Sequence, residues 1–256
     1  MKYLSLFVFT LVVNLILPPI GMTLEVKITP EIESVTVMHN GKEMVIQRVQ
    51  DQNNLVNPKY AKTSRPCPPF CINPMVLIQG VQTIGVLEVL NYLKKKGEGD
   101  NSILVIDARP VDSVVEASIP GSVSIPWDVL SGKKSSPPLV KKLLEKQFGV
   151  NIGNEDEKGG ENENRGNKSG SEDQNKSESE NDSENDSEND YNFENAKTLI
   201  LFCNGPWCDK SPSNIRTLLK LGYPPEKLKW YRGGMQSWES FGLTTVTDIP
   251  MPWFGL

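Results

Sequence analysis

Two short runs, each apolar apart from one end residue, constrain the fold of this 256-residue chain more than any other feature. They read ILVID at 103–107 and TLILF at 198–202, and a run with helical spacing follows each of them. Strands that are apolar on both faces are typical of parallel sheets with helices on each side. Because strands and helices alternate along the chain, the sequence predicts an α/β domain with an open, mainly parallel sheet flanked by helices.

The remaining elements extend this alternation. Apolar residues recur at helical spacing in 86–93, 137–149 and 211–222, and LKWY predicts another strand before a short helix. Nearer the N-terminus, apolar and polar residues alternate on both sides of Asn40-Gly41, a dipeptide favoured in type I′ turns, and predict a β-hairpin. We expect His39, the single histidine, to be exposed at the edge of this hairpin.

The N-terminus has the pattern of a signal peptide. One lysine precedes an apolar stretch from Tyr3 to Leu17, which Pro18-Pro19 ends. We expect residues 1–22 to be a signal peptide, with an uncleaved membrane anchor as the alternative. In both cases the rest of the chain is exported, to the periplasm or to the medium.

An acidic tract at 154–195 interrupts the chain. It holds 15 Asp and Glu residues against 4 Lys and Arg residues, in a chain whose net charge is −5. Because it has almost no apolar residues and repeats SEND, it cannot bury enough surface to offset its chain entropy. We expect a disordered insertion within a domain at 81–256, which follows a hairpin and cysteine-loop extension at 23–80.

Four cysteines form two close pairs, Cys67 with Cys71 and Cys203 with Cys208. In an oxidising compartment, paired cysteines are disulfides or managed redox groups. Neither pair has the ligand spacing of a zinc ribbon, so we predict no metal site. The first pair predicts a local disulfide in a proline-rich loop, with an electron or sulfur relay beside the catalytic loop as the alternative.

The loop after Cys203 suits a reactive thiol. Backbone N–H groups and a helix N-terminus favour a thiolate, Gly205 lets amides turn inward, and Lys210 adds positive charge at the rim. With no histidine as general base, sulfur transfer through a persulfide and thiol–disulfide exchange are the chemistries that fit. This interpretation requires an accessible Cys203 sulfur that faces those amides. The predicted anion-cradling loop consists of Asn204, Gly205, Pro206, Trp207, Cys208, Asp209, Lys210 and Ser211.

Cys208 has two interpretations. As a resolving thiol, it displaces sulfur from a persulfide on Cys203 or protects Cys203 through a reversible disulfide. As a structural residue, it forms a static disulfide with Cys203, which requires the loop to curl. Trp207 is either a rim aromatic or a packing residue. Trp127, by contrast, is expected to fill core or subdomain contacts.

Three segments, in this order, resemble the rhodanese-like domain family. They are LVIDARPVDSVVEASIPGSVSIP, LILFCNGPWCDKSPSNIRTLLKLGY and LKWYRGGMQSWESFGL. The resemblance covers residues 81–246 and implies that Cys203 is the catalytic, persulfide-forming cysteine. It also implies that Asp107, Arg109 and Arg232 support the site. The RPCPPFC segment resembles segments of exported members of the family.

The chain departs from the family pattern at two places. Ala117-Ser118 replaces the usual Gly-His, and Lys210-Ser211 follows the cysteine two residues later than the usual Arg-Ser pair. Cys208 therefore lies inside a longer loop. Related phosphatases grip phosphate with an arginine, whereas Asp209 repels a dianion, so we do not expect phosphatase activity.

Taken together, these patterns predict a sulfurtransferase that moves a sulfane sulfur from thiosulfate or a persulfide to a thiophilic acceptor. The alternatives are a thiol–disulfide redox protein using Cys203 and Cys208, with Cys67 and Cys71, and a non-catalytic binding module. We expect a small sulfur-containing substrate or a thiol protein as partner, with no cofactor and no nucleic acid. Contact with a membrane is expected only if the N-terminal segment is uncleaved.

Overall fold

The computed structural model describes residues 25–153 and 191–256, so the predicted signal segment and most of the acidic tract lie outside the described residues. Its centre is a five-stranded sheet in which every pair of neighbouring strands is parallel. This confirms the predicted fold class. In spatial order the strands are β3 (Gln82–Ile84), β9 (Leu228–Tyr231), β8 (Thr198–Phe202), β4 (Ile103–Asp107) and β5 (Val123–Ser124).

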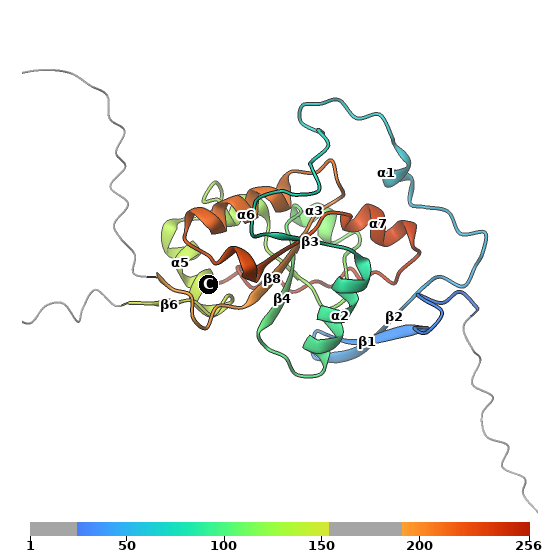
Figure 1. Cartoon of the computed structure of the whole chain (residues 1–256), viewed down its shortest axis with the longest axis horizontal. Helices are drawn as coiled ribbons and strands as arrows, with labels where there is room; N and C mark the ends of the chain where they lie inside the picture. Colours follow the sequence, from blue (N-terminus) through green and yellow to red (C-terminus); the bar gives the residue numbers. More distant parts are fainter. Residues whose placement is uncertain (1–24, 154–190) are drawn as a thin grey trace, which may run out of the picture.

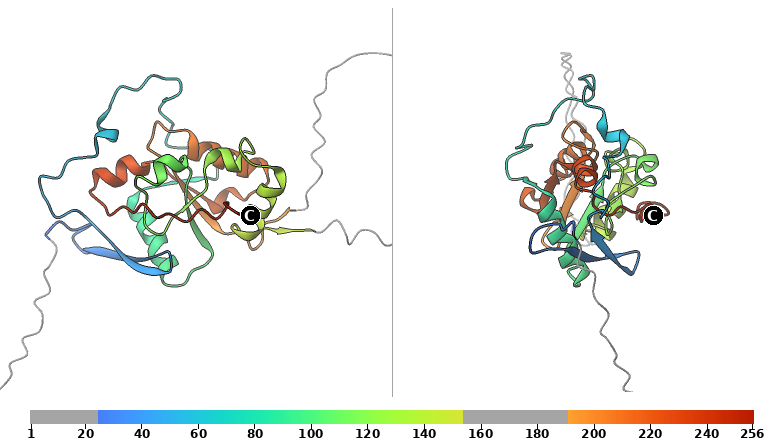
Figure 2. Two further views of the ribbon diagram at one scale, coloured as in Figure 1. Left: turned by 180° about the vertical axis from the view of Figure 1, so that it is seen from behind. Right: turned by 90° about the vertical axis from the view of Figure 1, so that its right-hand side faces the viewer.

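The two apolar runs occupy the middle of the sheet and supply both of its faces. Successive residues of β4 alternate between the two main hydrophobic clusters: Val105 packs with one and Leu104 with the other. Helices cover both faces, as Figures 1 and 2 show. One face carries α2 (Val86–Gly97) and α7 (Gly234–Ser240); the other carries α4 (Trp127–Leu130), α5 (Pro137–Lys146) and α6 (Lys210–Lys220). The short α3 (Val111–Val114) and η2 (Pro225–Lys227) complete the domain.

The predicted hairpin forms and packs against α2 (Figure 1). It consists of β1 (Ser34–His39) and β2 (Lys42–Gln47), and Asn40 and Gly41 at its turn have φ values of 49° and 74°, as a type I′ turn requires. The expectation that His39 is exposed was wrong. His39 is 4% exposed, because its Nε2 lies 3.0 Å from the Asp248 carboxylate and its Nδ1 accepts the Gly121 N–H.

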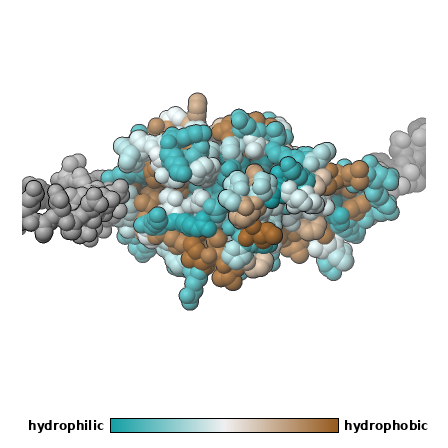
Figure 3. Space-filling view, turned by 90° about the horizontal axis from the view of Figure 1, so that it is seen from above, coloured by the Kyte–Doolittle hydropathy of each residue, from teal (hydrophilic) through white to brown (hydrophobic). Residues whose placement is uncertain are grey.

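A long connection joins the hairpin to β3. Figure 1 shows it rising from the hairpin, carrying the short α1 (Pro58–Ala61), and looping over the top of the domain before it descends. Viewed from that side, the surface shows apolar patches among polar ones (Figure 3). The connection contains Cys67 and Cys71, so the fold places the first cysteine pair above the sheet.

The acidic tract leaves the domain from a small antiparallel ribbon. β6 (Asn151–Ile152) pairs with β7 (Tyr191–Asn192), and the Phe193 ring lies 5.3 Å from that of Tyr223. Residues 191–195, which the sequence assigned to the insertion, therefore belong to the folded part, because their aromatic side chains pack on it. Within the described ranges, no helix is long and apolar enough to cross a membrane.

Candidate functional site

The site is built where β8 ends. Cys203 directly follows this strand, and the loop runs to the first residue of α6, Lys210. Ligand sites of open parallel sheets lie beyond the carboxyl ends of the strands. The structure therefore places the cysteine loop at the edge that the sequence predicted.

The start of α7 holds the beginning of this loop. The N–H groups of Met235 and Gln236 donate to the carbonyl oxygens of Cys203 and Asn204, at 2.9 and 2.8 Å. Such close approach requires glycine at 234, where φ is +53° and an added Cβ would overlap the Cys203 carbonyl. The Arg-Gly-Gly segment is thus explained by backbone packing against the cysteine loop.

The Cys203 sulfur is enclosed by protein. The residue is 2% exposed, its Sγ donates to the Cys208 carbonyl oxygen at 3.2 Å, and the Ser211 hydroxyl donates to the sulfur at 3.2 Å. Burial, together with the neighbouring Cys208, raises the pKa of the Cys203 thiol well above its usual value. The accessible sulfur that the sequence required at Cys203 is therefore absent, because the loop folds over it.

Cys208 is the cysteine that lines a pocket. It is a free thiol, like Cys203, so the structure contains no static disulfide in this loop. A hydrogen bond from the Cys203 thiol lowers the pKa of Cys208 to about 7, against the opposing effect of burial. The backbone N–H groups of Lys210 and Asn204 and the Lys210 charge act in the same direction.

Only part of the predicted amide cradle faces sulfur. The backbone N–H groups of Lys210 and Asn204 lower the pKa of Cys208, and that of Ser211 acts in the same direction on Cys203. The N–H of Cys208 is instead used within the loop, where it donates to the Gly205 carbonyl at 3.0 Å. This turn curls the loop so that its two cysteines meet.

The pocket beside Cys208 has a volume of about 400 Å³ and combines aromatic walls with two lysines. The Lys133 and Lys210 ammonium groups lie 4.7 and 5.6 Å from the centre of the Trp127 ring. Trp127 therefore faces the pocket, which corrects its assignment to the core. Asp209, whose carboxylate would oppose an anion, is paired with Arg216 at 3.0 Å. The pocket is lined by Pro69, Phe70, Trp127, Lys133, Asn204, Trp207, Cys208, Asp209, Lys210 and Ser213.

The proline-rich loop forms one wall of this pocket. Its cysteines, Cys67 and Cys71, form a disulfide, as the sequence predicted. Between them Phe70 meets the Trp207 ring edge-on, with 5.7 Å between ring centres. A disulfide-closed loop thus presents an aromatic residue to the second cysteine pair.

Two hydrogen-bonded contacts fasten this loop to the domain. The Asn73 N–H donates to the Pro206 carbonyl at 2.8 Å, and Arg232 donates to the Asn73 carbonyl at 2.8 and 3.2 Å. Arg232, predicted to support the site, therefore acts on the loop and not on the pocket itself. Trp207 is held in turn by Gln236, which accepts its indole N–H at 2.9 Å.

Asp107 and Arg109 form a buried ion pair beneath the site. Arg109 donates to both carboxylate oxygens, with Nη2 2.6 Å from Oδ2 and Nε 2.9 Å from Oδ1. Burial is the largest single effect and lowers the pKa of Arg109, but the Asp107 charge and hydrogen bonds, together with Tyr60 and Cys203, outweigh it, so the net shift is upward. Tyr60 extends the network, since it accepts from Arg109 and donates to Asn204, each at 3.4 Å.

Sequence reasoning missed three residues that the fold brings to the site: Tyr60, Trp127 and Lys133. Tyr60 lies in a connection without periodicity, so no pattern singles it out. Trp127 was expected to fill core or subdomain contacts, because only the order of the strands brings its helix beside the cysteine loop. Sequence distance hides such contacts.

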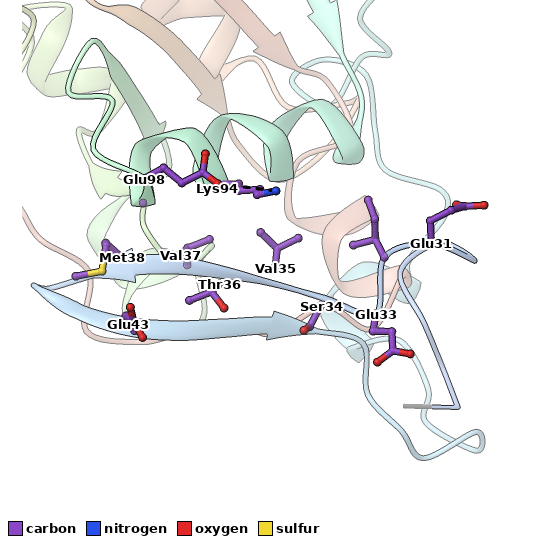
Figure 4. A pocket seen from close by; sticks show the side chains of 12 residues that line it. Glu31, Glu33, Ser34, Val35, Thr36, Val37, Met38, Glu43, Lys94 and Glu98 are labelled. Carbon is purple, nitrogen blue, oxygen red and sulfur yellow. Dashed lines mark ion pairs between the residues drawn. The ribbon is translucent and has the colours of Figure 1, made fainter. Parts of the chain in front are cut away.

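A larger hollow, of about 540 Å³, lies between β1 and the end of α2 (Figure 4). Val35 and Val37 form its floor, and Lys94 pairs with Glu98 at 3.9 Å. No cysteine is among its lining residues, so we place the chemistry at the cysteine loop. The described residues include no cluster of histidine, cysteine or acidic side chains able to hold a metal ion.

The fold and the paired thiols define a parallel α/β protein with a cysteine site at the carboxyl ends of its strands. The Rhodanese-like domain model matches residues 89–241, and the chain belongs to this family. No curated protein matches the chain.

Solved structures similar to the chain include a rhodanese-related protein from Thermoplasma volcanium, at 17% identity and a TM-score of 0.35. That match covers 65% of this chain and 99% of the other. A thiosulfate sulfurtransferase from Pseudomonas aeruginosa matches at 17% identity and a TM-score of 0.36, over 68% of this chain and 22% of the other.

Proposed function

We propose that this protein is a sulfurtransferase that takes a sulfane sulfur from a small anionic donor, thiosulfate or a persulfide. The sulfur then passes to a thiophilic acceptor. One observation carries the proposal: a pocket with two lysines on its rim opens onto a thiol whose pKa is lowered to about 7. The lowered pKa favours the thiolate, the form that attacks sulfur.

The pocket supplies the two things that this reaction needs. Lys133 and Lys210 attract the anionic donor and offset its repulsion by the thiolate. The amides of Asn204 and Lys210 hydrogen-bond the negatively charged sulfur. A persulfide anion formed on this cysteine is stabilised by the same backbone amides.

Transfer of sulfur from thiosulfate to cyanide, followed as thiocyanate, tests the proposal. The double variant Cys203→Ser/Cys208→Ser should lose all transfer above the uncatalysed rate. Lys133→Gln and Lys210→Gln should each raise the KM for thiosulfate on the order of fivefold, about 1 kcal/mol per charge. Lys134→Gln is the matched control, because Lys134 pairs with Asp128 outside the pocket. Full transfer by the double variant would refute the proposal.

A second candidate is thiol–disulfide exchange, which the contact between two reduced thiols favours. This chemistry needs both Cys203 and Cys208, whereas sulfur transfer to cyanide needs one attacking thiol. Reduction of a model disulfide by each single variant separates the two. A protein inactive in both assays would instead be a binding module.

We also propose that the protein works in an oxidising compartment. The exposed Cys67–Cys71 disulfide supports this setting, since such bonds persist outside the cytosol. Thiol titration of the protein isolated without reductant tests the proposal, with two of the four cysteines expected to react after unfolding.

A further inference from the structure

The two cysteines of the loop occupy different places, and only one of them meets the pocket. We infer that Cys208 is the thiolate that attacks the sulfane sulfur. Cys203 is then the resolving thiol that expels this sulfur as sulfide by closing a Cys203–Cys208 disulfide. This inference rests on the proposed function and deepens it, since it assigns each thiol and adds a product. It reverses the order that the family resemblance implies.

The surroundings of Cys208 fit the attacking thiol. Cys208 lines the pocket with Lys210 and Lys133, and Cys203 does not line it. The N–H groups of Asn204 and Lys210 point to the Cys208 sulfur. The anion-binding groups of the loop are therefore gathered around the second cysteine.

The surroundings of Cys203 fit a resolving thiol. A chain of donors fixes its proton: the Trp230 indole donates to the Ser211 hydroxyl, and this hydroxyl donates to the Cys203 sulfur, each at 3.2 Å. The Cys203 thiol in turn donates to the Cys208 carbonyl at 3.2 Å and hydrogen-bonds the Cys208 sulfur. Cys203 therefore remains a neutral thiol, behind Cys208, until Cys208 has reacted.

The loop geometry allows the two sulfurs to join. The N–H of Cys208 donates to the Gly205 carbonyl, and this turn brings the second cysteine back over the first. A disulfide between residues five apart requires such a curl, because the two Cα atoms must approach closely. The structure already has it in the reduced form.

The reaction with thiosulfate balances in two steps. The Cys208 thiolate attacks the outer sulfur of thiosulfate; the S–S bond of thiosulfate breaks and sulfite leaves with the electron pair. The Cys203 thiol then attacks the inner sulfur of the Cys208 persulfide, its proton passes to the outer sulfur, and hydrosulfide leaves. The sulfane sulfur is reduced by two electrons, and the two cysteines are oxidised to a disulfide.

An external dithiol closes the cycle. It attacks the Cys208 sulfur from the pocket, Cys203 leaves as a thiol, and the second thiol of the reductant releases Cys208 while the reductant becomes a disulfide. Position again favours this order, because Cys208, although only 5% exposed, is the residue of the pair that lines the pocket. With thiosulfate alone, and neither a dithiol nor an acceptor such as cyanide, the enzyme turns over once and stops as the disulfide.

The experiment treats reduced protein with thiosulfate alone, then measures sulfide and maps cysteine masses after alkylation. All proteins keep Cys67 and Cys71, whose loop walls the pocket, because mass mapping distinguishes their disulfide from one between Cys203 and Cys208. With Cys203 and Cys208 intact, we expect about one sulfide per protein and a Cys203–Cys208 disulfide. Cys203→Ser should hold a mass gain of about 32 Da on Cys208 and release at least about tenfold less sulfide. Cys203→Ala guards against effects of the serine hydroxyl.

Each outcome is decisive. Suppose that persulfide accumulates on Cys203 in the Cys208→Ser variant and none forms on Cys208 in the Cys203→Ser variant. This result overturns the assignment of Cys208 as the attacking thiol and leaves the proposed sulfur transfer intact. Loading of Cys208 without sulfide release from the intact pair overturns the resolving step alone. No sulfur on either cysteine, in proteins whose circular dichroism matches that of the parent, overturns the proposed function itself.

Discussion

Removal of the Arg109 side chain tests how the site is supported. Arg109 and Asp107 are 1% and 0% exposed, and Arg109 makes three bonds to the carboxylate as well as one to the Ala117 carbonyl at 2.6 Å. Arg109→Met leaves the Asp107 charge buried and uncompensated. Breaking a buried pair in this way costs about 3–5 kcal/mol. We therefore expect the free energy of unfolding to fall by that amount.

Urea unfolding measures this change. With a slope of roughly 2 kcal/mol per molar urea, the midpoint should fall by about 1.5–2.5 M at an unchanged slope. The matched variant Asp107→Leu/Arg109→Met removes both charges and should recover roughly 2 kcal/mol of the loss. Recovery stays incomplete because the Ser118 hydroxyl, 2.6 Å from the carboxylate, loses its acceptor.

Two results would refute this reasoning. If Arg109→Met unfolds within about 1 kcal/mol of the parent, the buried carboxylate has another source of compensation. If the double variant is less stable than Arg109→Met, the cost comes from lost packing and not from the unpaired charge.

Three further predictions concern the cysteine loop. Gly234→Ala should reduce sulfur transfer by about tenfold or more, because the added Cβ pushes the Cys203 carbonyl from its place; unchanged kcat would contradict this. The rate of Cys208 alkylation should rise with pH, with a midpoint near pH 7, and level off only above about pH 8, where the thiolate predominates. Cys203→Ala should move the pH midpoint of Cys208 alkylation upward, because the hydrogen bond from the Cys203 thiol is lost. An unchanged midpoint would show that this hydrogen bond does not lower the pKa of Cys208. Arg232→Met should lower the free energy of unfolding by about 1–3 kcal/mol, measured by thermal unfolding, because the partly buried hydrogen bonds to the Asn73 carbonyl are lost. An unaltered Tm would show that these bonds do not stabilise the loop.

The central sheet follows from the sequence with little ambiguity. Residues 103–107 and 198–202 are apolar at every position except the terminal Asp107 and the initial Thr198, and only a strand buried on both faces accommodates that pattern. Asn40-Gly41 specified the hairpin turn for an equally local reason, because few residues adopt positive φ without strain. The cysteine loop could be placed at the end of a strand on the same grounds.

What the sequence could not determine was which way each thiol faces. Cys203 and Cys208 lie in one loop, and both are buried, at 2% and 5% exposed, but the loop curls so that only Cys208 lines a pocket. That pocket also needs Trp127 and Phe70, which reach it from distant segments through the order of the strands and the path of the long connection. Local propensity determines the helices and strands. The burial of an atom, and the surroundings that set a pKa, depend on every segment that packs around that atom. Only the tertiary structure therefore decides the burial and the pKa of each thiol.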